Sequence, residues 1–323
     1  MLYLFDESLL IIVTSCNARL EGLMLTYPLL SPRKLVASSM GPEHPDFHTL
    51  APIAADIEAR VPSLLTELPA QMLAAFESVL EPVRTGRTRL AELDNVEKTF
   101  VGLKVEHFVR DMLGAPKGIR DLVLASQNVD VKNTVGKTWA WMIPPETYRS
   151  SEPCLLMALD EARWQAWMGL IVARPDYLGN PNRDEKRGIL VNAYSNILWL
   201  VQGVSLPPNH WLGLDMARFR ELRQIKGGSL RAAVYFRENL RRPTHRSVLQ
   251  ALLYDQHDYM KRLRDNGGAK DILKEENIAL LSGKYSNQLL IQLGLTPIGN
   301  DEHIALDVRT HTESRILREN GEL

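Results

Sequence analysis

One short stretch, residues 128–133, limits the fold and the chemistry of this chain more than any other. It reads NVDVKN, so polar residues alternate with β-branched valines. Alternation with a period of two is typical of a β-strand that buries one face. We therefore predict a strand here, with Asp130 and Lys132 side by side on one face and the two valines anchored in a core on the other.

A second aspartate, Asp121, lies nine positions before Asp130. This distance leaves room for a turn at residues 125–127, so that the chain returns beside itself and both carboxylates converge with Lys132. Mg²⁺ prefers oxygen ligands, and two aspartates suffice to hold one ion. A lysine close by can position a water and stabilise the charge on an attacked phosphate, so the pattern predicts phosphodiester hydrolysis. The alternative is that Asp130 and Lys132 form an ordinary ion pair.

Two helical regions, residues 50–80 and 93–113, precede this strand, because apolar residues recur there at intervals of three and four. The first region is expected to break near Pro62 and Pro69. Glu106 lies in the second region, where it either faces solvent or points at the two aspartates as a metal ligand or an orienting base. The expected core contacts of the second region are Phe100, Leu103, Phe108 and Met112.

Apolar runs that are compatible with strands follow at residues 139–146, 154–159 and 164–173, and residues 189–201 are expected to be helical. Strands framed by helices predict an α/β (α+β) fold, in which helices pack on a mixed sheet. The sequence LPPN at residues 206–209 interrupts the pattern. We therefore expect a leader of doubtful order at residues 1–42, with Met24 or Met40 as alternative starts, a first domain at 43–204 and a second at 205–323.

Composition excludes several classes of protein. A length of 323 residues accommodates two domains, and a net charge of −1 argues against a chain that coats nucleic acid over its whole surface. Two cysteines are too few for a zinc site or a disulfide framework, so we expect a cytoplasmic protein. The apolar run at residues 9–13 follows acidic residues and is too short for a bilayer, so we expect neither export nor a membrane partner.

The second domain has a local excess of positive charge. Residues 218–264 contain twelve Lys or Arg and four acidic residues, a net charge of +8. This density is typical of a surface that contacts phosphates, although a solvated helical face is the alternative. Short helices expected at residues 244–254, 258–264 and 269–273, with the sequence NGG before the last, predict a helix-turn-helix arrangement. The candidate DNA-binding residues are Arg241, Arg242, Arg246, Lys261, Arg262 and Arg264.

Glu106, Asp121 and the triplet at 130–132 resemble the PD-(D/E)xK nuclease signature, in the spacing of its MutH and NaeI-like branch. Arg120 stands where the signature has proline. Longer segments resemble NaeI-like restriction endonucleases and follow the family order from about residue 97 to residue 295. They are EKTFVGLKVE (97–106), NVDVK (128–132), WMIPPE (141–146), WMGLI (167–171), NRD (182–184), LPPN (206–209) and DYMKRLRDNGGA (258–269).

This resemblance implies a restriction-endonuclease-like first domain and a second, DNA-binding domain with a helix-turn-helix similar to that of the catabolite activator protein. It implies a Mg²⁺-dependent homodimer that cuts palindromic double-stranded DNA, is activated by a second DNA site and is linked to a cognate DNA methyltransferase. Asp121 and Asp130 would be metal ligands, Lys132 would position the water, and Glu106 would be an accessory acid and metal ligand. The alternatives are a MutH-like nickase and a catalytically inactive DNA-binding regulator.

Overall fold

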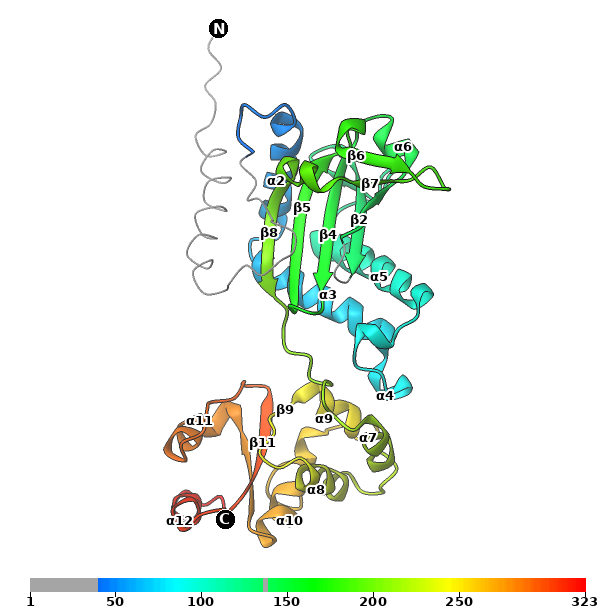
Figure 1. Ribbon diagram of the computed structural model, residues 1–323. Coiled ribbons are helices and arrows are strands. Elements are labelled where there is room, and N and C mark those ends of the chain that lie inside the picture. The colour runs from blue at the N-terminus through cyan, green and yellow to red at the C-terminus, as the bar shows by residue number, and fades with distance from the viewer. Residues whose placement is uncertain (1–39, 136–138) are drawn as a thin grey trace. The chain divides into compact units, whose positions relative to one another are not determined.

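The computed structural model describes residues 40–135 and 139–323. The chain divides into two compact units (Figure 1): unit 1 comprises residues up to Leu80 and Leu90–Pro207, and unit 2 comprises Glu81–Arg89 and Pro208–Leu323. The expected leader lies outside the described residues except at its end, where Met40 is buried in the core of unit 1. None of the helices in the described part is both long enough and apolar enough to span a bilayer.

Unit 1 is built on a mixed sheet of five strands in the order β1-β2-β4-β5-β8. β2 and β4 run parallel, and the other neighbouring pairs are antiparallel. Every residue of β4 is buried, as expected for a central strand that is covered on both faces. The strands are β1 (Leu122–Leu124), β2 (Gln127–Val135), β4 (Pro153–Asp160), β5 (Gln165–Val172) and β8 (Leu198–Ser205). The expected mixed α/β organisation is confirmed.

The two faces of this sheet are covered differently. Alternate residues of β4, such as Leu155 and Met157, pack against helices α2 (Phe47–Arg60), α3 (Leu64–Leu80) and α5 (Asn95–Leu113). The intervening residues face an aromatic cluster, in which neighbouring ring centroids lie 5.0–6.4 Å apart. The cluster consists of Trp139, Trp141, Trp167, Tyr194 and Trp199. A smaller sheet in the order β3-β7-β6, formed by β3 (Met142–Ile143), β7 (Arg187–Ile189) and β6 (Leu178–Pro181), and helix α6 (Pro145–Tyr148) complete the unit.

Some expected local structures are wrong. The helical region 50–80 breaks at Pro62 as expected, but α3 continues through Pro69, because the packing of that buried residue and its neighbours outweighs one lost backbone hydrogen bond. Residues 189–201 are not an α-helix: they form a short 3-10 helix (η4, Val191–Asn196) and then enter β8, whose large apolar side chains are buried in the sheet. In the apolar run 139–146 only β3 is a strand.

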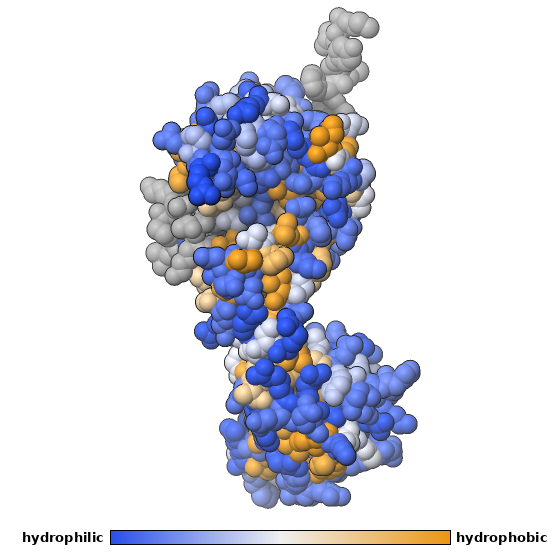
Figure 2. Space-filling view, turned by 90° about the vertical axis from the view of Figure 1, so that its right-hand side faces the viewer, coloured by the Kyte–Doolittle hydropathy of each residue, from blue (hydrophilic) through white to orange (hydrophobic). Residues whose placement is uncertain are grey.

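The expected core contacts of helix α5 are confirmed in part. Phe108 and Met112 are partly buried and pack against the core, whereas Phe100 and Leu103 are 52% and 47% exposed. The fully buried contacts are made by a stripe spaced four residues apart, which consists of Val101, Val105, Val109 and Leu113. Scattered apolar side chains also lie on the otherwise mainly hydrophilic surface seen in Figure 2.

Unit 2 packs helices on both faces of a three-stranded antiparallel sheet, ordered β10-β11-β9. Alternate residues of β10 separate the two layers, because Ile278 and Leu280 face one core and Ala279 and Leu281 face the other. Its elements are α4 (Pro82–Thr85), α7 (Met216–Leu222), α8 (Gly228–Glu238), β9 (Thr244–His245), α9 (Arg246–Leu252), η5 (Met260–Arg262), α10 (Ala269–Glu275), β10 (Ile278–Ser282), α11 (Gly283–Gln292), β11 (Glu302–Asp307) and α12 (His311–Glu319).

The packing of α5 predicts a large difference between two substitutions on the same helix. Val105→Ala should lower the free energy of unfolding by roughly 2 kcal/mol, because it leaves a cavity in the core. Phe100→Ala should cost less than about 1 kcal/mol, because that ring is half exposed. Urea denaturation of both variants checks this, and a larger loss from Phe100→Ala would mean that the helix is rotated.

Unit 2 should lose stability in mild acid because of a buried histidine. Burial lowers the pKa of His303 to about 4, and Nδ1 of this residue has no hydrogen-bond partner among the described residues. The neutral ring is favoured in the folded state, so its contribution is complete above about pH 6.5 and should fall by about 3 kcal/mol as the pH drops to 4. Denaturation of His303→Leu at several pH values should show a shallower loss, whereas His311→Leu, at an exposed position, should match the wild type.

Candidate active site

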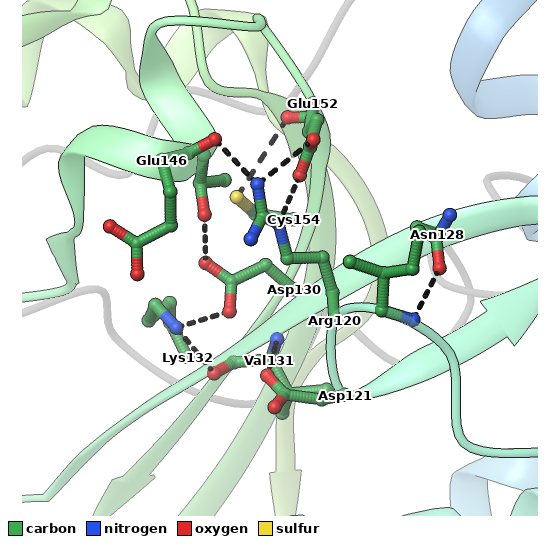
Figure 3. Close-up of polar contacts among 11 residues, drawn as sticks. Arg120, Asp121, Asn128, Asp130, Val131, Lys132, Glu146, Glu152 and Cys154 are labelled. Carbon is green, nitrogen blue, oxygen red and sulfur yellow. Dashed lines mark hydrogen bonds and ion pairs between the residues drawn. The ribbon is translucent and has the colours of Figure 1, made fainter.

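A tight hairpin places Asp121 beside β2, the strand that carries Asp130 and Lys132. β1 and β2 are joined at Ala125 and Ser126, whose φ angles of +46° and +62° suit a two-residue turn with the twist of a hairpin. Asp121 immediately precedes β1, and its Oδ2 accepts a hydrogen bond of 2.7 Å from the Val131 N–H. The structure therefore brings Asp121 next to Asp130 on the predicted strand (Figure 3).

The loop before Asp121 is held by close packing at Gly118. Its position leaves no room for a side chain, because a Cβ there would collide with the Asn128 amide oxygen. That oxygen accepts a hydrogen bond of 2.9 Å from the Ile119 N–H, so β2 fixes the loop directly. The contact explains why a glycine is required two residues before Arg120.

Asp130 is a buried carboxylate with two donors. Only 4% of the residue is exposed, one oxygen accepts from the Lys132 ammonium, and the other accepts a hydrogen bond of 2.8 Å from the Thr147 hydroxyl. Burial raises the pKa of Asp130, and the neighbouring Asp121 carboxyl adds to this, whereas Lys132 and Thr147 oppose it. The ion pair between Asp130 and Lys132 thus exists, but inside the protein rather than on its surface.

Glu106 is half buried on α5, within electrostatic range of the pair. Burial raises the pKa of Glu106, and the negative charge of Asp121 raises it further, while Lys132 lowers it. Glu106 does not line the cavity that the other candidates share. No set of three His, Cys, Asp or Glu side chains in residues 40–135 and 139–323 is arranged to hold a metal ion.

The remaining donors nevertheless fit Mg²⁺. Asp121 and Asp130 supply carboxylate oxygens, and the Val131 carbonyl, which accepts a hydrogen bond of 3.1 Å from Lys132, lies among them. An oxygen-only set suits a hard cation. Burial and the neighbouring Asp121 carboxyl disfavour the charged form of Asp130, and a divalent cation would offset that penalty.

Asp121, Asp130 and Lys132 share a cavity of about 400 Å³, here called the carboxylate cavity. It is lined by Ile119, Arg120, Asp121, Asp130, Lys132, Met142, Pro144, Glu146, Thr147 and Lys186. Four of these residues, Arg120, Glu146, Thr147 and Lys186, were not among the predicted site residues. Arg120 pairs with Glu152 and donates a hydrogen bond of 2.6 Å to the Glu146 carbonyl, so it ties the Asp121 loop to α6. The contacts of Arg120 and Thr147 span 17 or more positions, so no local pattern could have revealed them.

The basic candidates of unit 2 fall into two groups. Arg241 pairs with Asp307 and Glu313 at 2.9 Å, and Arg242 donates hydrogen bonds of 2.7 Å to the Leu212 and Gly213 carbonyls. Both guanidinium groups are therefore engaged within the protein. Arg246, Lys261, Arg262 and Arg264 are exposed.

The hydrogen bond from the Thr147 hydroxyl to Asp130 predicts a specific effect on stability. Thr147→Val keeps the shape of the side chain but removes a donor from a buried carboxylate, so it should lower the free energy of unfolding by about 1–2 kcal/mol. Thr147→Ser retains the hydroxyl and should lose clearly less. Denaturant midpoints of the two variants check this, and a larger loss in Thr147→Ser than in Thr147→Val would show that the methyl group matters more than the hydrogen bond.

Comparison with known proteins places this geometry in a family. The model of the restriction endonuclease NaeI family matches residues 59–316. The type II restriction enzyme NaeI of Lentzea aerocolonigenes is 31% identical over 215 residues, which is 64% of this chain and 66%, just under two thirds, of that enzyme. Since the family model covers most of the chain, including both aspartates and Lys132, the protein belongs to the restriction endonuclease NaeI family.

Proposed function

We propose that this protein is a type II restriction endonuclease, which uses Mg²⁺ to hydrolyse phosphodiester bonds in both strands of a specific double-stranded DNA sequence. The observation that carries the proposal is that Asp121, Asp130 and Lys132 line one cavity in a chain of this family. Two carboxylates and a lysine match the chemistry needed at a phosphodiester.

In the proposed mechanism, Asp121 and Asp130 would hold Mg²⁺. When bound, Mg²⁺ supplies Lewis-acid polarisation of the phosphate group. Lys132, oriented by its contacts with Asp130 and the Val131 carbonyl, positions the attacking water and stabilises the negative charge that develops on the phosphate. Thr147 fixes the second oxygen of Asp130. Glu106, which lies outside the cavity lining, would act as an accessory acidic residue within electrostatic range of Asp121.

We propose that unit 2 is a second DNA-binding domain with a helix-turn-helix. Two short helices, α9 and α10, precede β10, and this order supports the proposal. The exposed basic residues Lys261, Arg262 and Arg264 lie on the segment between these helices, and Arg246 begins α9. The proposal rests on these four exposed residues more than on Arg241 and Arg242, which are only partly exposed.

The proposed functional form is a cytoplasmic homodimer that binds two DNA sites. Each chain carries one set of Asp121, Asp130 and Lys132 and would therefore cut one DNA strand. A dimer with two-fold symmetry matches the symmetry of a palindromic duplex. Binding of the second site through unit 2 would activate cleavage. A cognate DNA methyltransferase would protect the host's own copies of the sequence.

Digestion of unmethylated plasmid and phage DNA tests this function. Wild-type protein should give discrete fragments in Mg²⁺ and none in EDTA, because the carboxylates require the cation. Asp130→Asn should reduce cleavage by about 10³-fold or more while binding of DNA in Ca²⁺ is retained. Asp184→Asn is a matched control, since Asp184 precedes Lys186 with the same spacing but lies exposed in a turn, and it should cleave normally.

Other outcomes of the digestion would point elsewhere. Nicked circles without linear product would favour a MutH-like nickase. Intact DNA that is retarded in a gel, in the presence of a second DNA site added in trans, would favour a catalytically inactive DNA-binding regulator.

A further inference from the structure

A second lysine lines the carboxylate cavity from a separate part of unit 1. We propose that Lys186 binds substrate, with its ammonium group on a backbone phosphate of DNA that occupies this cavity. The inference rests on the function proposed above, and it adds a residue that the family motifs quoted from the sequence do not include.

Lys186 has a fixed backbone although its side chain is exposed. It lies in the turn between β6 and β7, where the Asn182 side chain accepts hydrogen bonds of 2.9 Å from the Asp184 N–H and 3.0 Å from the Lys186 N–H. The Asn182 N–H in turn donates to the Lys186 carbonyl at 2.8 Å. These bonds close the turn, so the side chain starts from a defined point.

The turn is attached to α6, which also carries Thr147 (Figure 1). Glu185 pairs with Arg149 at 2.9 Å and accepts a hydrogen bond of 3.2 Å from the Tyr148 hydroxyl through its carbonyl. On the other side of Lys186, the Arg187 guanidinium lies 4.9 Å from the centroid of the Tyr148 ring. Since Thr147 on α6 donates a hydrogen bond to Asp130 on β2, α6 links the turn to the strand that carries Asp130 and Lys132.

Lys186 differs from Arg120 and Lys132, the other cations that line the cavity, in having no ion-pair partner among the described residues. Arg120 is paired with Glu152, and Lys132 is paired with Asp130. The Lys186 ammonium has no ion pair or side-chain hydrogen bond with any residue that the structure describes. An exposed ammonium that lines a cavity and has no ion pair suits a phosphate, which it binds as a point charge.

Single-turnover cleavage at saturating enzyme tests the inference. Lys186→Ala should cleave at least about tenfold more slowly, because one cationic contact to the reacting part of the DNA is lost. Lys186→Arg should recover most of the rate. Arg183→Ala removes the same charge from the same turn but outside the cavity lining, and it should stay within about twofold of the wild type. Both positions are exposed, so the thermal midpoints of the three variants should be unchanged.

A footprint of amine reactivity separates this inference from the proposed function. In Ca²⁺, duplex DNA should protect Lys186 from acylation, as measured by mass spectrometry, and should leave the exposed Lys104 on α5 reactive. Protection of Lys186 without cleavage in Mg²⁺ would support the inference and reject the function. Cleavage by the wild type, with Lys186 unprotected and Lys186→Ala fully active, would overturn the inference and keep the function, as would an equal loss of rate in Arg183→Ala.

Discussion

The buried carboxylate of Asp130 is the constraint on which the rest of unit 1 depends. A charged group with 4% exposure next to a second carboxylate is unstable unless other groups offset the cost of its desolvation. Lys132 supplies the opposite charge and Thr147 supplies a hydroxyl donor. The pKa of Asp130 is still raised, chiefly by burial, so the folded protein retains an electrostatic penalty that a divalent cation would relieve. Such retained penalties are characteristic of sites that evolved for chemistry rather than for stability.

The elements around Asp130 position the groups that contact its carboxylate. The tight turn between β1 and β2 is needed to bring Asp121 to the same end of the sheet, and Gly118 allows the loop before it to pack against β2. Helix α6 has only four residues, yet it supplies the Thr147 donor and, through its neighbours, the attachment of the β6–β7 turn. The cavity is therefore assembled from segments that are far apart in the sequence, each fixed by a polar contact to the next.

Local patterns predicted the centre of the site but not its periphery. Alternation at residues 128–133 gave the strand, and the nine-residue separation gave the hairpin that places Asp121 beside Asp130. Both signals lie within one hairpin, where geometry is determined by neighbouring residues. Thr147 and Lys186 approach from segments 17 and 56 positions beyond Asp130, so their placement depends on tertiary packing that no periodicity encodes. The buried face of α5 was predicted only in part, because the stripe Val101, Val105 and Val109 packs into the core while Phe100 is half exposed.

Charge counted along the sequence also overstates the charge available on unit 2. The excess of +8 in residues 218–264 ignores acidic partners that lie outside that window. Arg237 pairs with Glu276, and Arg241 pairs with Asp307 and Glu313, so these cations stabilise the fold of unit 2. Pairing with a carboxylate removes most of the attraction that an arginine exerts on a phosphate. The capacity of unit 2 to bind DNA would therefore depend mainly on basic side chains without a carboxylate partner, such as Lys261, Arg262 and Arg264, and the same reasoning singles out Lys186 among the cations that line the carboxylate cavity.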